Sequence, residues 1–146
     1  MKVSKDNLFV IFSLLLTITP SQAKDLLFDY TIVTVKNDIQ GENITIHCYF
    51  SENDLGDHQL SYGSNFTWHF DVNFWHSTKF YCDFKTNHGS GNYGVYTSTL
   101  KVRCNVLCVW LIRVNGPCLQ QTNYYDQLWC QKWKIPPQFG LNGPPY

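Results

Sequence analysis

Apolar and polar residues alternate along several short segments between residues 30 and 114. A period of two is expected of a β-strand, because successive side chains point to opposite faces of a sheet. No segment of comparable length has the 3.6-residue period of an amphipathic helix. The pattern therefore predicts an all-β fold. The predicted strands are residues 30–37, 44–50, 66–72, 80–84, 100–104 and 108–114.

Cysteines are placed on the apolar sides of these predicted strands, at Cys48, Cys82, Cys104 and Cys108. Strands that bury one face and are joined by sulfur bridges are typical of a β-sandwich. We therefore expect a small, disulfide-stapled antiparallel β-sandwich that is immunoglobulin-like in architecture.

Turn residues separate the predicted strands. The segment at residues 52–57 is acidic, and residues 87–94 are rich in glycine and form the clearest hairpin loop. The acidic segment could bind calcium, but it lacks the alternating ligands of an EF-hand loop. We favour a structural turn in which Asn53 and Asp54 bond to their own backbone and Gly56 adopts a positive φ.

Both ends of the chain differ in composition from its middle. Residues 1–23 have a basic start, a short apolar run and small residues before a cleavage point, which together predict a secretory signal peptide. An uncleaved anchor is the alternative. Residues 136–146 are rich in Pro and Gly, so we expect a flexible tail, with an arm that docks on the domain or a partner as the alternative. Residues 24–135 are left as one domain.

Cysteine content and charge narrow the compartment and the partner. Six cysteines in a small exported chain predict disulfides rather than a zinc site. Without residues 1–23 the chain has 9 basic and 10 acidic residues, so neither nucleic-acid binding nor a polybasic membrane patch is expected. We expect a secreted, extracellular monomer that is not membrane-embedded, uses no cofactor or metal and recognises its partner through a specific surface.

Two Asn-X-Thr sequences begin at Asn43 and Asn65. Both asparagines lie on the polar side of a predicted strand, near its start. Because a glycan needs an exposed side chain, we expect N-glycosylation at both positions.

A set of residues between 30 and 118 has the order and spacing of a known plant family. Its most specific part is the block formed by His47, Cys48, Asp54, Gly56 and His58. The other matching residues include Asn37, Trp68, Phe70, Phe80, Cys82, Cys104, Cys108, Trp110 and Gly116. The chain resembles the plant self-incompatibility protein S1 family, also called S-protein homologues, although Cys118 and Cys130 are additional to the usual four cysteines. The resemblance implies a small secreted β-sandwich without known enzymatic activity, which acts as a ligand for a cell-surface receptor or membrane protein.

Two other function classes are weighed against this non-enzymatic ligand. A secreted hydrolase or defence protein could use two histidines as general acid and base, but no ribonuclease-type motif follows His69 and no nucleophile elbow is present. An extracellular lipid- or carbohydrate-binding module would need exposed aromatic side chains, which are more often part of a core. The aromatic candidates are Trp75, Tyr124, Tyr125, Trp129 and Trp133.

Recognition by a β-sandwich concentrates in loops that rigid strands hold in place. The best candidates are residues 57–65 and residues 87–94, although the second could be an ordinary hairpin connection. The expected partner-binding residues are Asp57, His58, Asn87, His88, Asn92 and Tyr93.

The disulfide connectivity is a separate prediction, because six cysteines allow many pairings. Cys82 and Cys104 flank the glycine-rich segment on strands that could be neighbours, so we pair them. We then pair Cys48 with Cys108. The two additional cysteines, Cys118 and Cys130, form the third pair.

Overall fold

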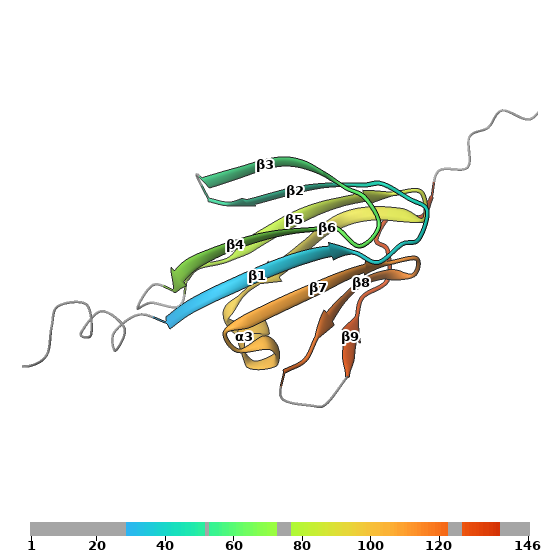
Figure 1. Cartoon of the computed structure of the whole chain (residues 1–146). Coiled ribbons are helices and arrows are strands. Elements are labelled where there is room, and N and C mark those ends of the chain that lie inside the picture. The colour runs from blue at the N-terminus through green and yellow to red at the C-terminus, as the bar shows by residue number, and fades with distance from the viewer. Residues whose placement is uncertain (1–28, 52, 73–76, 123–126, 138–146) are drawn as a thin grey trace, which may run out of the picture.

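The computed structural model describes residues 29–51, 53–72, 77–122 and 127–137. These residues form two β-sheets that lie one above the other as two layers (Figure 1). The five-stranded sheet has the order β4-β1-β7-β8-β9, and the four-stranded sheet has the order β3-β2-β5-β6. The all-β prediction is confirmed. The strands are β1 (Asp29–Asn37), β2 (Ile44–Phe50), β3 (Asn53–Leu60), β4 (Asn65–Val72), β5 (Phe80–Thr86), β6 (Gly89–Tyr96), β7 (Leu107–Arg113), β8 (Gly116–Gln120) and β9 (Leu128–Cys130).

The predicted strand at residues 100–104 is wrong, because this segment belongs to helix α3 (Ser98–Cys104). The hydroxyl of Thr97 caps the helix by accepting a hydrogen bond from the N–H of Leu100 at 3.2 Å. Leu100 and Cys104 are four residues apart, so both face the core from one side of the helix, whereas Val102 is 75% exposed. Apolar residues four positions apart fit both the period of two of a strand and the 3.6-residue period of a helix. The Thr97 cap favours the helix here.

The acidic segment is not a separate turn, since Asn53–Leu60 forms strand β3. Its pairing with β2 is irregular between His47 and Tyr49, where β3 contains one extra residue. Gly56, with φ +79°, lies in this bulge, and its N–H donates to Asp54 Oδ1 at 2.8 Å. The contact of Asp54 with the nearby backbone and the positive φ of Gly56, which we expected in a turn, therefore occur in a bulged strand.

The glycine-rich segment is also mostly strand. Residues 89–96 form β6, which pairs with β5 through a tight turn at Asn87 and His88. Gly89 lies so close to Trp133 that an added Cβ would be 2.3 Å from Cγ of the indole. This glycine allows a close approach between chain segments, which explains why the glycines resemble a loop in the sequence.

One pair of neighbouring strands departs from the expected antiparallel arrangement. β1 and β7 are parallel, whereas the other bonded strand pairs among the described residues are antiparallel. A parallel pair needs a crossover. Here the chain leaves β1, forms β2 and β3, and returns to place β4 beside β1. It then forms β5 and β6 of the four-stranded sheet and reaches β7 through α3 (Figure 1).

The core between the two sheets is centred on Trp110 of β7, whose side chain is fully buried. Its Nε1–H donates to the carbonyl oxygen of Val95 in β6 at 2.8 Å. This hydrogen bond joins the five-stranded sheet to the four-stranded sheet and satisfies a polar group that burial would otherwise leave without a partner.

The disulfides correct two predicted pairings. The structure joins Cys48 to Cys82 and Cys104 to Cys108, so the pairs Cys48–Cys108 and Cys82–Cys104 are wrong. Cys48 and Cys82 lie opposite each other on the neighbouring strands β2 and β5, with Cα atoms 4.1 Å apart. Cys104 ends a helix rather than a strand beside β5, and the turn at Asn105 brings it to Cys108. The third bridge, Cys118–Cys130, joins β8 to β9.

These bridges do not cross between the two sheets. Cys48–Cys82 lies within the four-stranded sheet and Cys118–Cys130 within the five-stranded sheet. Antibody domains instead have a disulfide between their sheets. The two sheets confirm the predicted sandwich. The positions of the bridges give no support to the prediction that its architecture is immunoglobulin-like.

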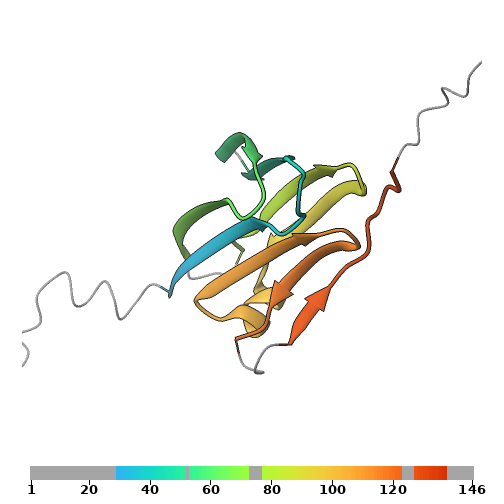
Figure 2. The same ribbon diagram turned by 45° about the vertical axis from the view of Figure 1, so that its right-hand side comes forward.

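Residues 131–137, which we call the C-terminal strap, connect the two layers along one side of the sandwich (Figure 2). The N–H of Gln131 donates to the carbonyl oxygen of Pro117 in β8 at 2.9 Å. Ile135 then exchanges two backbone hydrogen bonds of 3.0 Å with Ser90 in β6. The strap is therefore docked on the domain as far as Ile135, the last residue before the predicted tail.

The predicted signal peptide, residues 1–23, lies outside the described residues, and so does the predicted tail, residues 136–146, from residue 138 onward. Among the described residues, we find no helix with the length and apolar character needed to span a membrane.

We predict that the three bridges differ in their contribution to stability. A bridge that closes a longer loop restricts the unfolded chain more, and the sequence separations are 34, 12 and 4 residues. Replacing both cysteines by Ala should lower the free energy of unfolding by about 4 kcal/mol for Cys48–Cys82, about 3 for Cys118–Cys130 and about 2 for Cys104–Cys108. Urea unfolding of the three double variants measures this order, and a smallest loss for Cys48–Cys82 would contradict it.

Candidate functional site

The outer face of the four-stranded sheet carries ordered rows of side chains, because every second residue of its strands points away from the core. Strand register places the members of each row beside one another in the order β3, β2, β5, β6. We call them the hydroxyl row, the histidine row and the tyrosine row. From β3 to β6, the hydroxyl row is Gln59–Thr45–Lys85–Ser90, the histidine row is Asp57–His47–Asp83–Asn92, and the tyrosine row is Asp54–Tyr49–Tyr81–Gly94.

His47 is at the centre of the acidic part of this face. Its Nδ1 lies 2.6 Å from Asp57 Oδ1, and its Nε2 lies 3.0 Å from Asp54 Oδ1. The hydrogen bond to Asp57 raises the pKa of His47, and the negative charges of Asp54, Asp57 and Asp83 add to this, while partial desolvation opposes it. Only the protonated imidazole can donate from both nitrogens, so the geometry suits the cation.

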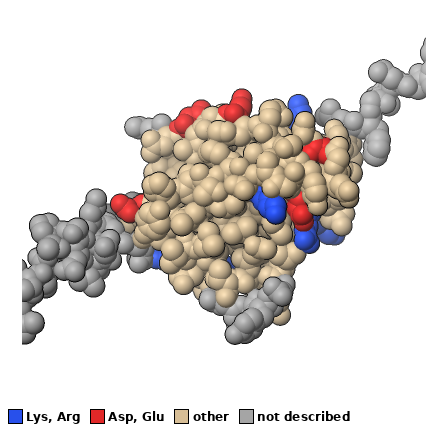
Figure 3. All heavy atoms as spheres, in the orientation of Figure 1, with Lys and Arg blue, Asp and Glu red and all other residues tan. Residues whose placement is uncertain are grey.

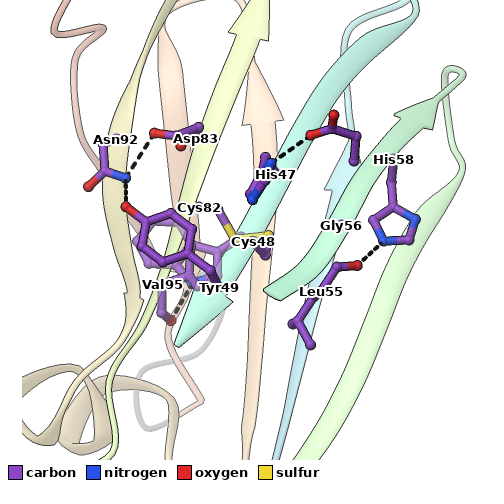
Figure 4. Close-up of a disulfide and its surroundings, with 12 residues drawn as sticks. His47, Cys48, Tyr49, Leu55, Gly56, His58, Cys82, Asp83, Asn92 and Val95 are labelled. Carbon is purple, nitrogen blue, oxygen red and sulfur yellow. Dashed lines mark hydrogen bonds and ion pairs between the residues drawn. A yellow bond between two sulfur atoms is a disulfide. The ribbon is translucent and has the colours of Figure 1, made fainter. Parts of the chain in front are cut away.

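Asn92 orders the other half of the face. Its side-chain Nδ2 donates to Asp83 Oδ1 at 2.9 Å and to the hydroxyl of Tyr49 at 2.8 Å (Figure 4). The Tyr49 ring stacks with Tyr81 on the neighbouring strand, with centroids 6.2 Å apart. An amide, a carboxylate and two phenol rings are thus held in fixed relative positions.

An open groove of about 790 Å³ runs along the same face. One side is formed by β2, β5 and β6, and the other by Ile135, Pro136 and Pro137 of the strap. Its polar lining includes Thr45, His47, Asp83, Lys85, Thr86, Asn87, Ser90 and Asn92. The groove is therefore walled by polar groups from three strands and by the docked end of the strap.

The predicted partner-binding residues divide into two groups. Asp57 and Asn92 lie on the outer face, and Asn87 and His88 form the turn between β5 and β6. The Asn87 N–H donates to the carboxylate of Glu42, which also lies 3.4 Å from His88 Nε2. These four residues remain candidates for contact with a partner.

Tyr93 and His58 were expected to contact a partner, but the structure places them in packing positions. Tyr93 is 1% exposed, and its hydroxyl donates to the carbonyl oxygen of Lys132 at 2.9 Å. Burial raises the pKa of this phenol, with a partial offset from the N–H of Lys134. His58 donates to the carbonyl oxygen of Leu55 and stacks on Phe66 at a centroid distance of 3.7 Å. Tyr93 therefore presents no contact surface, whereas His58 is half-buried and is held by these two contacts.

Sequence reasoning missed His47, Tyr49, Tyr81, Asp83 and Lys85 as candidates. Each lies on the polar side of a period-two pattern, so the signal was present. It was not used because recognition was sought in loops rather than on a sheet face.

The predicted glycosylation sites and the aromatic candidates for ligand binding lie away from the outer face of the four-stranded sheet or outside the described residues. Asn43 and Asn65 are both exposed, and neither lies in the three rows of the outer face. Trp129 packs edge-on against Trp110, and Trp133 donates to the carbonyl oxygen of Val114 at 2.8 Å, so both have structural roles. Trp75, Tyr124 and Tyr125 lie outside the described residues.

Metal binding finds no support in the described part of the chain, where no three His, Cys, Asp or Glu side chains are grouped to hold an ion. Figure 3 shows acidic side chains near the edge formed by β3 and no continuous basic area on the face in view. The outer face is therefore a polar surface with mixed hydrogen-bonding groups.

Comparison with known proteins identifies the family. The model of the plant self-incompatibility protein S1 family matches residues 32–133. The chain belongs to this family. It is 36% identical to S-protein homolog 74 of Arabidopsis thaliana over 106 residues, which cover 70% of each chain. It is 31% identical over 93 residues to the self-incompatibility protein S1 of Papaver rhoeas, covering 61% of this chain and 65% of the relative.

A longer match within the S1 family is to S-protein homolog 29 of Arabidopsis thaliana, with 30% identity over 118 residues, 80% of this chain and 87% of the relative. No solved structure matches. Among the S1 motif residues of the sequence, Asn37, Cys48, Cys82 and Trp110 are fully buried, which shows that much of the motif builds the fold.

We predict that the contacts of His47 make stability depend on pH. A pKa raised in the folded state means that its ion pairs stabilise fully below the ordinary value of 6.5, and that this contribution is lost as the pH rises through the raised value. The stability lost on His47→Gln should therefore be larger near about pH 5 than near about pH 9. Urea unfolding at both pH values measures it.

A matched variant checks the cause. Asp57→Asn should move the NMR titration of His47 toward its ordinary value, because the largest raising contact is removed. An unchanged titration, or an equal stability loss at both pH values, would refute this account of the pair.

Proposed function

We propose that this protein is a secreted, non-enzymatic extracellular ligand of the S1 type. It binds a cell-surface partner through the outer face of the four-stranded sheet and the adjoining turn at Asn87 and His88. Support for secretion comes from the signal-peptide pattern of residues 1–23 and from disulfides that an oxidising compartment permits. Family membership supports a self-incompatibility-type protein.

One observation carries the choice of surface. Polar side chains of the histidine row are exposed or half-buried and yet oriented by one another, with Asp57 bonded to His47 and Asn92 bonded to Asp83. Side chains that are ordered before binding lose less entropy when a partner arrives. The opposite, outer face of the five-stranded sheet carries the expected glycan at Asn65 on β4.

The contacts of His47 and His58 support a binding role over catalysis. Both ring nitrogens of His47 face carboxylates, and the Nε2 of His58 is bonded to a backbone carbonyl. A general base needs a nitrogen within reach of a substrate proton, which these contacts occupy. We therefore favour recognition by a preformed surface.

Secretion predicts N-glycans at Asn43 and Asn65, since both side chains are exposed. Glycosidase treatment of the secreted protein should lower its mass, and Asn43→Gln and Asn65→Gln should each remove one step of that loss. A mass equal to that of the unmodified chain from residue 24 onward would overturn the assignment.

The proposed function predicts saturable binding to intact cells of the plant that makes the protein. The double variant Asp83→Ala/Asn92→Ala removes an acid and an amide from the outer face, and should weaken cell binding about tenfold or more if they are central contacts. Asp71→Ala/His69→Ala on β4 is the matched control, because both residues are exposed on the other sheet. Labelled protein titrated onto cells measures both.

Two results would contradict this proposal. One is an absence of saturable binding by the wild-type protein. The other is an equal loss of binding in both double variants, which would show that the outer face has no special role.

A further inference from the structure

The outer face has a chemical character that narrows the kind of molecule it recognises. We propose that it binds a neutral oligosaccharide, which lies along the groove and stacks a sugar ring on the tyrosine row. This inference rests on the proposed function, because it names the ligand chemistry of the same face.

The shape of the groove favours an extended ligand. The groove is open to solvent and is lined by β2, β5, β6 and the strap. A small, apolar molecule is normally enclosed on most sides. A chain that lies across the strands can use such an open surface.

The groups that line the groove both donate and accept hydrogen bonds. Thr45 and Ser90 contribute hydroxyls, and Asn87 and Asn92 contribute amides, whereas the Thr86 hydroxyl is bonded to the backbone of His88 and Gly89 within the turn. A hydroxyl does both, and an amide offers one group of each kind. A ligand rich in hydroxyl groups matches this mixture, whereas an aliphatic or lipid ligand would leave the polar groups without partners.

Charge argues against a strongly ionic ligand. Asp83 and Lys85 lie on the same strand and bring opposite charges to the groove. Nearby, the carboxylates of Asp54 and Asp57 are already paired with His47. An anionic chain would meet Asp83, and a cationic peptide would meet Lys85 and compete with an existing ion pair. A neutral ligand avoids both conflicts.

Asp83 and Asn92 are positioned to receive hydroxyl donors. Both hydrogens of the Asn92 amide are used in the bonds to Asp83 Oδ1 and the Tyr49 hydroxyl. Asn92 therefore presents its Oδ1, and Asp83 its second carboxylate oxygen, as acceptors. Two acceptors on paired neighbouring residues suit the adjacent hydroxyls of a sugar ring.

The tyrosine row supplies an apolar platform beside these acceptors. Tyr49 and Tyr81 are half-buried and stacked with an interplanar angle of 27°. The next position in the row is Gly94, where an added Cβ would lie 3.6 Å from Cε1 of Tyr81. Because glycine has no side chain, no side chain from this position of β6 covers the Tyr81 ring, which packs close to the Gly94 backbone. Aromatic faces pack well against the C–H face of a sugar.

The test uses the full-length secreted protein and defined probes in a calorimetric or array binding assay. One arm contains neutral cell-wall oligosaccharides (xyloglucan and mannan fragments), and another contains high-mannose N-glycans, so the arms distinguish a wall polymer from a glycoprotein. Acidic oligogalacturonides and a basic peptide serve as charged comparisons. We expect saturable binding to a neutral probe from one of the two arms.

Variants locate the binding. Tyr81→Ala and Asn92→Ala should each weaken binding of the neutral probe by about tenfold or more, whereas His69→Ala on β4 should leave it unchanged. Thermal unfolding of each variant checks the fold. If Tyr81→Ala is destabilised, the binding result of Asn92→Ala is used instead. Failure of the wild type to bind any neutral probe, full binding by Asn92→Ala, or preference for a charged probe would overturn the inference.

The two proposals can fail separately. Saturable cell binding without any neutral oligosaccharide binding would leave the ligand function and overturn this inference. Oligosaccharide binding without saturable cell binding would support the inference and contradict the proposed cell-surface ligand. Competition of cell binding by the free oligosaccharide supports both.

Discussion

The hydrogen bond from the buried indole of Trp110 to the carbonyl oxygen of Val95 joins the two layers of this sandwich at the centre of its core. None of the three disulfides makes that connection. Packing of apolar side chains around Trp110 must therefore hold the sheets together, and loss of such a buried aromatic side chain typically costs about 3–5 kcal/mol. One set of side chains of the four-stranded sheet is buried against this core, so the alternate set points outward. The candidate recognition face therefore depends on the packing around Trp110.

Rigidity of that face comes from two further features. The bridge between Cys48 and Cys82 ties its two central strands, β2 and β5. The C-terminal strap covers one end of the β6 edge and packs Trp133 against Gly89. A surface supported in this way can present Asp83 and Asn92 in fixed positions, which is how a sheet without an enclosed pocket can still be selective.

Sequence reasoning predicted most strands and their buried faces, because a period of two is a local property. Ile44 and Ile46 face inward and His47 faces outward as the alternation requires. It failed where a distant segment decides the local structure. Gly89 lacks a side chain because Trp133, more than forty residues away in the sequence, packs against it. Its glycines made this segment resemble a loop, so Tyr93 was predicted to be exposed although it belongs to a buried position of a strand. The pairing of Cys48 with Cys82 likewise follows from strand order, which no local pattern encodes.

We propose above all that a partner is recognised by the outer face of the four-stranded sheet. An added glycan tests this most directly, because its bulk covers a chosen face. Asp83→Asn with Lys85→Thr creates an acceptor sequence on β5, and His69→Asn with Asp71→Thr creates one on β4. With glycan attachment and folding checked by mass and thermal unfolding, binding to intact cells is then measured. We predict that the β5 glycan abolishes binding and the β4 glycan does not; undiminished binding with the β5 glycan would contradict the claim.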